Sequence, residues 1–149
     1  MADAFTASNP DYAETVRESF GRQGLMTTLG ARIATIEPGF CVIEMPHAPG
    51  VSQQQGFFHG GAIGAIADTA AGYAAYSLMP VGSEILTVEY MLNLVRAAMP
   101  PILRAEGRVL RAGRTLTVCR ADIYHRGANG LETCALLQST LMRMEPVRP

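Results

Sequence analysis

Residues 53–69 read QQQGFFHGGAIGAIADT, and from Gly60 a stretch of mostly small, apolar residues runs to Met79. Pro80 and Gly82 then break the pattern, so the sequence predicts a helix from about residue 60 to residue 78. The helix is apolar on nearly every face, which is typical of a helix enclosed by other structure. Its single charged residue, Asp68, lies near the middle, and Ala and Gly supply little transfer free energy. Both features argue against a membrane span.

Segments that alternate like strands flank this helix. Two of them precede it, and four follow it after a break. The predicted strands are residues 25–36, 40–45, 84–96, 102–111, 115–126 and 131–144. In the third strand, the alternation puts Leu86, Val88, Tyr90, Leu92 and Leu94 on one face. The order predicts an α+β fold in which one antiparallel sheet wraps around one central helix.

The composition describes a chain with a real core. Its 149 residues are 48% apolar and 17% charged, which excludes wholesale disorder and suits one domain with a short arm. A short amphipathic helix near the N-terminus divides the chain into a helical arm, residues 1–24, and a main domain, residues 25–149. The net charge of −1 lacks the basic excess that nucleic acids or anionic membranes attract, so neither partner is expected.

The basic and sulfur-containing residues exclude further chemistry. All 12 basic residues are arginine, so Schiff-base and P-loop lysine chemistry is excluded. Three widely spaced cysteines without a CxxC motif fit free thiols in a reducing compartment. The first residues lack the basic and apolar regions of a signal peptide, so we expect a cytoplasmic location. His47 and His125 lack metal-ligand spacing, so no metal site is expected.

Asp68 and the Gly60-Gly61 pair are the candidates for chemistry. A buried carboxylate is costly unless it is paired, hydrogen-bonded or needed for function, so Asp68 is either catalytic or a structural group at an interface. The amides of Gly60 and Gly61 lie at the helix start, where the helix dipole favours an oxyanion. An ordinary loop-to-helix junction explains the same two glycines. Both alternatives stay open for both features.

Gly60 and Asp68 are too far apart along the helix to act on the same atom. Gly60 and Asp68 are eight residues apart, which is about 12 Å along a helix. One reaction centre cannot touch both groups of the same chain. If both act on one centre, they must come from two chains that meet at a two-fold interface.

The HGG at residues 59–61, Asp68 seven residues later in a small-residue helix, and the order of elements resemble the PaaI-like hotdog-fold thioesterases. This family includes the phenylacetyl-CoA and hydroxybenzoyl-CoA types, and the resemblance covers about residues 25–144. It implies the hotdog fold, with an antiparallel sheet around one long central helix. It also implies hydrolysis of acyl-CoA thioesters without a cofactor, by homodimers that pair into dimers of dimers.

The resemblance implies a role for each matching residue. Asp68 matches the general base or nucleophile, and Gly60 matches the glycine whose amide, from the other subunit, polarises the thioester carbonyl. His59 matches the residue that shapes the helix start, and Gln53 lies where the family carries Asn or Gln near the carbonyl or water. Gly61 and Thr87 are assigned to substrate binding. The turn that matches the family's CoA contact contains Arg111, Ala112, Gly113, Arg114 and Thr115. An exposed basic hairpin explains each of its arginines equally well.

The sequence therefore predicts a thioesterase for a hydrophobic acyl-CoA, either medium-chain or aryl. The aromatic residues Phe57, Phe58, Tyr73 and Tyr76 line the acyl pocket or only pack. The N-terminal helix caps that pocket or only covers the edge of the sheet. Two other functions stay open: a non-catalytic acyl-CoA-binding module, and an enoyl-CoA hydratase of the same fold.

Overall fold

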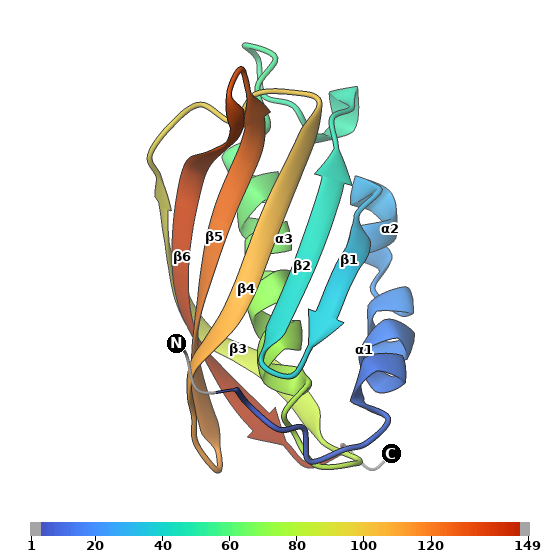
Figure 1. Ribbon diagram of the computed structural model, residues 1–149. Helices are drawn as coiled ribbons and strands as arrows, with labels where there is room; N and C mark the ends of the chain where they lie inside the picture. The colour runs from blue at the N-terminus through green and yellow to red at the C-terminus, as the bar shows by residue number, and fades with distance from the viewer. Residues whose placement is uncertain (1–3, 147–149) are drawn as a thin grey trace.

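The computed structural model describes residues 4–146 and has the predicted order of elements, with one short α-helix and one 3-10 turn added (Figure 1). In chain order the elements are α1 (Tyr12–Gly21), α2 (Gly24–Leu29), β1 (Arg32–Glu37), β2 (Phe40–Pro46), η1 (Pro49–Val51), α3 (Gly60–Tyr76), β3 (Glu84–Leu94), β4 (Ile102–Ala112), β5 (Leu116–Gly127) and β6 (Gly130–Met144). The predicted segments 1–24 and 25–149 each include three terminal residues, 1–3 and 147–149, that lie outside the described part.

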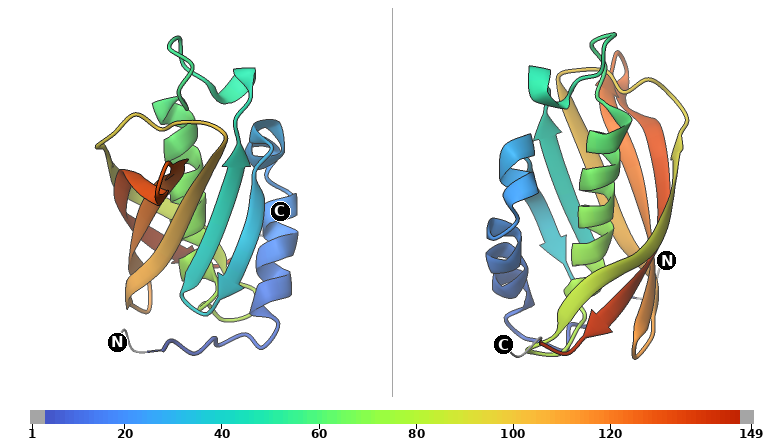
Figure 2. Two further views of the ribbon diagram at one scale, coloured as in Figure 1. Left: turned by 45° about the horizontal axis from the view of Figure 1, so that its top comes forward. Right: turned by 180° about the vertical axis from the view of Figure 1, so that it is seen from behind.

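The six strands form one antiparallel sheet in the order β1-β2-β4-β5-β6-β3. The sheet curls around α3, so the predicted α+β hotdog fold is confirmed (Figure 1). α1 and α2 lie alongside β1 at one edge (Figure 2). β3 forms the other edge of the sheet (Figure 2). It pairs with β6 on one side only.

Small side chains let α3 approach the sheet closely. Ala67, Ala70, Ala71 and Ala74 are fully buried against it. A Cβ added to Gly107 of β4 would lie 2.3 Å from the backbone carbonyl carbon of Ala70, so only glycine fits there. The backbone of α3 therefore packs directly against the backbone of β4 at this point, and Gly107 sets the distance between them. None of the helices among residues 4–146 has the length and apolarity needed to span a membrane.

The predicted strand over residues 25–36 is wrong in its first half, where the chain forms α2. Met26 is buried and Leu29 is half-buried, which is helical spacing. Gly30 ends the helix in the left-handed conformation, with φ of 67°. A short apolar run fits a helix and a strand equally well, and the glycine at its end is the distinguishing signal.

The predicted single face of β3 is also wrong. Its pairing with β6 shifts register between Thr87 and Glu89. Before the shift, Thr87 faces Asp68 of α3. After it, Leu92 and Leu94 lie beside Gly64 and Gly60 of α3. A β-bulge adds one residue and so moves the alternate side chains to the opposite face, which strict alternation cannot predict.

Candidate active site

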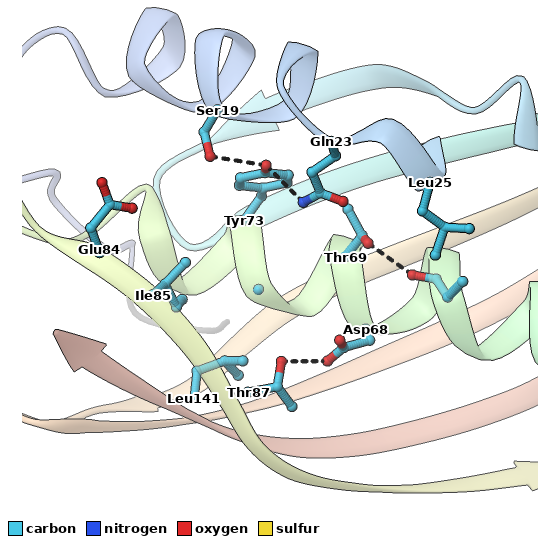
Figure 3. Close-up of a pocket in the computed structure, with 12 residues that line it drawn as sticks. Ser19, Gln23, Leu25, Asp68, Thr69, Tyr73, Glu84, Ile85, Thr87 and Leu141 are labelled. Carbon is cyan, nitrogen blue, oxygen red and sulfur yellow. Dashed lines mark hydrogen bonds between the residues drawn. The ribbon is translucent and has the colours of Figure 1, made fainter. Parts of the chain in front are cut away.

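Asp68 lies on the face of α3 that turns toward β3 and the N-terminal helices (Figure 3). The Thr87 hydroxyl donates a hydrogen bond to Asp68 Oδ1 at 2.8 Å. Burial raises the pKa of Asp68 above the ordinary value of 3.8, and the hydrogen bond from Thr87 opposes part of that rise. A carboxylate whose charge is poorly solvated is a stronger base than an exposed one.

A pocket of about 280 Å³ opens beside this carboxylate. Its walls come from the α1–α2 junction, α3, the start of β3, and β6 (Figure 3). The pocket is lined by Ser19, Gln23, Leu25, Ala65, Asp68, Thr69, Gly72, Tyr73, Glu84, Ile85, Thr87 and Leu141. Asp68 and Thr87, both candidates from the sequence, therefore meet in one cavity.

Gly60 and Gln53 lie in a different pocket, of about 360 Å³, at the N-terminal end of α3. Phe57 and Phe58 line the same pocket. Gln53 Oε1 accepts hydrogen bonds from the backbone amides of Gln55 and Phe57, so this side chain holds its own turn together. The structure thus separates the Gly60 group from the Asp68 group within one chain.

The start of α3 leaves the Gly60 amide without an acceptor among the described residues. His59 Nδ1 accepts a hydrogen bond from the Gly61 amide at 2.8 Å, so His59 caps the helix and occupies the Gly61 donor. Among residues 4–146, no group accepts a hydrogen bond from the Gly60 amide. This N–H lies at the positive end of the helix dipole, where it can stabilise a developing negative charge.

The basic turn lies near the other end of α3. Ala112, Gly113 and Arg114 line a pocket of about 220 Å³ that also includes Arg143. The Gly113 amide donates to the Leu116 carbonyl at 2.9 Å, so this amide is not free to bind a ligand. Arg111, Arg114 and Thr115 are exposed, and neither arginine forms an ion pair within the described part of the chain.

Two residues of the Asp68 pocket were missed by sequence reasoning. Ser19 and Gln23 reach it from the end of α1 and the residue before α2. They follow the buried Val16 and the half-buried Phe20 at helical spacing, so Ser19 lies on the apolar face of α1 and Gln23 continues the same pattern beyond its end. That spacing is the signal in the sequence from which both residues could have been predicted.

Across residues 4–146, no group of three or more His, Cys, Asp or Glu side chains is arranged to hold a metal ion.

Residues 55–130 match the family model described as the Thioesterase superfamily, which is about half of the chain. The chain belongs to this superfamily, and it is a thioester hydrolase of the hotdog fold. It is 40% identical to a thioesterase family protein from Silicibacter pomeroyi, whose solved structure superposes with a TM-score of 0.88 over 91% of this chain and 99% of that one.

More distant relatives share the same architecture. The PaaI protein from the phenylacetic acid degradation operon of E. coli is 21% identical, with a TM-score of 0.81 over 93% of this chain and 96% of that one. That likeness shows the fold alone. A protein from Saccharolobus solfataricus named as an esterase is 28% identical over 102 residues, which cover 68% of this chain and 71% of the relative.

Proposed function

We propose that this thioesterase hydrolyses a hydrophobic acyl-CoA, medium-chain or aryl, to the free acid and CoA. The observation that carries the proposal is a half-buried carboxylate, Asp68, held by the Thr87 hydroxyl at the wall of a pocket. In this proposal Asp68 acts as general base for water or as nucleophile. The Gly60 amide of a second copy binds the oxyanion. No cofactor enters the reaction, because a thiolate is already a good leaving group.

The open edge of β3 supports an active site shared by two copies. β3 pairs with β6 on one side, and its other side has no partner strand among the described residues. An unpaired edge of 11 residues is a template for a second strand. Large apolar side chains on this strand and just after it are about half exposed: Leu86, Val88, Tyr90, Met91, Leu94 and Val95. A second copy would cover both the edge and these side chains.

Antiparallel pairing of two β3 strands brings the required groups together. The middle of the strand is Glu89, so a two-fold axis there sets Leu94 of the partner subunit opposite the start of β3. Within one chain, Leu94 lies against Gly60, and Thr87 bonds Asp68. The pairing therefore carries Gly60 of the partner subunit toward Asp68. In this proposal the two-fold axis gives two equivalent reaction centres per dimer.

The remaining site residues serve binding in this proposal. His59 fixes the helix start by capping Gly61 and leaves the Gly60 N–H for the thioester oxygen. Gln53 shapes the turn next to Gly60. The turn with Arg111, Ala112, Gly113, Arg114 and Thr115 offers two exposed guanidinium groups to the CoA phosphates. We further propose dimers of dimers, and a cytoplasmic location that suits the three free thiols.

A thiol-release assay across acyl-CoAs of different chain length and aryl type tests this function. Release of free CoA from hydrophobic substrates is the expected result. Tight binding without release would instead identify a non-catalytic acyl-CoA-binding module. Addition of water to an enoyl-CoA without thiol release would identify a hydratase.

The Thr87→Val variant is expected to move the acidic limb of the pH profile to higher pH. Thr87 lowers the pKa of Asp68 by its hydrogen bond, so its removal leaves burial unopposed. A general base works only when it is ionised, and the apparent pKa of kcat/KM should therefore rise. The measurement is kcat/KM against pH for both proteins. An unchanged acidic limb would show that Asp68 ionisation does not limit the reaction.

The Val88→Lys variant is expected to be monomeric and to lose activity by about 100-fold or more, because the oxyanion donor of the second copy is lost. Val88 is 53% exposed on the open edge of β3. Leu110→Lys is the matched control, since Leu110 is 51% exposed on β4, an inner strand. Sedimentation analysis gives the mass of each protein. A Val88→Lys dimer, or a fully active monomer, contradicts the shared site.

A further inference from the structure

Three polar side chains meet at the end of the Asp68 pocket that α1 closes (Figure 3). Gln23 Nε2 donates a hydrogen bond to the Tyr73 hydroxyl at 2.9 Å, and Ser19 Oγ lies 3.1 Å from the same oxygen. Tyr73 is only 3% exposed. The rest of the pocket wall includes the apolar side chains of Leu25, Ile85 and Leu141 and the polar side chains of Thr69 and Glu84. The cluster therefore lies at one end of a pocket whose remaining walls combine apolar and polar side chains.

The hydrogen bonds within the cluster leave groups for a ligand. A tyrosine hydroxyl has one hydrogen and two lone pairs. If it donates to Ser19 Oγ, the Ser19 hydrogen is free, and if it accepts from Ser19, its own hydrogen is free. Gln23 Oε1 accepts no hydrogen bond from any described residue. The cluster thus offers one donor and one acceptor, which is the complement of a hydroxyl group.

The charges around the pocket disfavour an anionic ligand group. Two carboxylates, Asp68 and Glu84, line the cavity, and no arginine does. Arg22 acts on Tyr73 electrostatically but does not belong to the pocket wall. A terminal carboxylate would approach two like charges in a partly desolvated space, whereas an uncharged polar group would not.

The distance between Asp68 and Tyr73 along α3 determines how long such a ligand can be. Tyr73 follows Asp68 by five residues, which is about 7.5 Å along the helix axis. A thioester carbon beside Asp68 and a polar atom beside Tyr73 are thus separated by a short run of methylene groups. We propose that Ser19, Gln23 and Tyr73 bind an uncharged hydroxyl group at the far end of the acyl chain and so determine the acyl specificity. This inference rests on the proposed function and narrows its substrate class.

The experiment compares matched acyl-CoA pairs of four to eight carbons, with and without a terminal hydroxyl, in the thiol-release assay. We expect at least one pair in which the hydroxylated substrate has a kcat/KM about 10-fold higher, the size of one or two neutral hydrogen bonds. The corresponding dicarboxylic acyl-CoA should be the poorest of the three. A preference for the dicarboxylic substrate, or no hydroxyl preference at any length, would overturn the inference even where hydrolysis itself is normal.

Two variants connect the preference to the cluster. Tyr73→Phe should bring the ratio of the two kcat/KM values within a pair to about one, whatever its effect on the rate that both substrates share, and Gln23→Leu should reduce that ratio. Tyr76→Phe is the matched control, because the Tyr76 hydroxyl donates to the Ser83 carbonyl and does not line the pocket. A preference that survives in Tyr73→Phe contradicts the inference.

Failure of the proposed function would give a different result, namely no thiol release from any acyl-CoA. The inference is then tested by calorimetric Kd values for the same pairs. Tighter binding of the hydroxylated member, lost in Tyr73→Phe, supports it, and equal Kd values overturn it.

Discussion

The Asp68→Asn variant is expected to lose activity by about 100- to 10,000-fold, the contribution of a positioned general base. Asparagine has nearly the same shape, and its oxygen can still accept the hydrogen bond from Thr87. The variant should therefore fold and bind acyl-CoA. Single-turnover thiol release and calorimetric binding measure the two properties separately. Near-normal turnover would remove Asp68 from the chemistry.

The same variant should be more stable than the parent at neutral pH. Burial raises the pKa of Asp68 in the folded state, so folding becomes less favourable as the pH rises from the ordinary value of 3.8 through the raised one. An asparagine at this position does not ionise, so the variant does not lose folding stability as the pH rises. Asp122→Asn is the contrasting control, since Asp122 accepts hydrogen bonds from Arg120 and does not line the pocket. We expect it to keep activity and to lower Tm.

The Gly60→Pro variant is expected to lower kcat by about 100- to 1,000-fold, as removal of an oxyanion donor does. Gly60 is the first residue of α3, a position where proline is well tolerated. His59 before it has an extended conformation, φ −68° and ψ 137°, which suits a residue that precedes proline. The substitution thus removes the amide hydrogen and keeps the helix start. Circular dichroism checks the helix, and steady-state thiol release gives kcat.

Gly60→Ala is the matched control for that variant. Its Cβ would lie 2.8 Å from Leu94 Cδ1, the end of a flexible side chain, so it shares the crowding but keeps the N–H. We expect most of the activity to remain. Equal losses in the two variants would assign the effect to crowding and not to the missing donor.

Mixing the two inactive proteins then tests which chain supplies which group. Random exchange of Asp68→Asn and Gly60→Pro subunits makes half of the dimers mixed, and each mixed dimer has one intact centre if the groups come from different chains. About a quarter of the parental activity should return. No recovery after demonstrated exchange would place both groups in the same chain.

Sequence reasoning succeeded where local pattern determines structure. The run of alanine and glycine around Asp68 predicts α3, and the rise of a helix already separates Gly60 from Asp68. It failed at α2, where six residues cannot distinguish two periodicities. It also failed at the bulge after Thr87, because strict alternation leaves no sign of one extra residue.

The rest of the candidate site depends on long-range contacts. Strand order is absent from local pattern, so the unpaired edge of β3 appears only in the folded sheet. The same is true of Ser19 and Gln23, which come from the predicted arm but line the wall opposite Thr87. Their position favours a helix that closes the pocket over one that only covers the sheet.

The contact between Gly107 and the backbone of Ala70 has a consequence for how such enzymes diversify. At Gly107 no side chain separates the helix from the sheet, so a substitution there would push α3 away from β4 and displace Asp68. The N-terminal helices, which contribute Ser19, Gln23 and Leu25 to the pocket, are free of this constraint. Mutational libraries confined to these helices should retune selectivity while leaving the reaction itself intact.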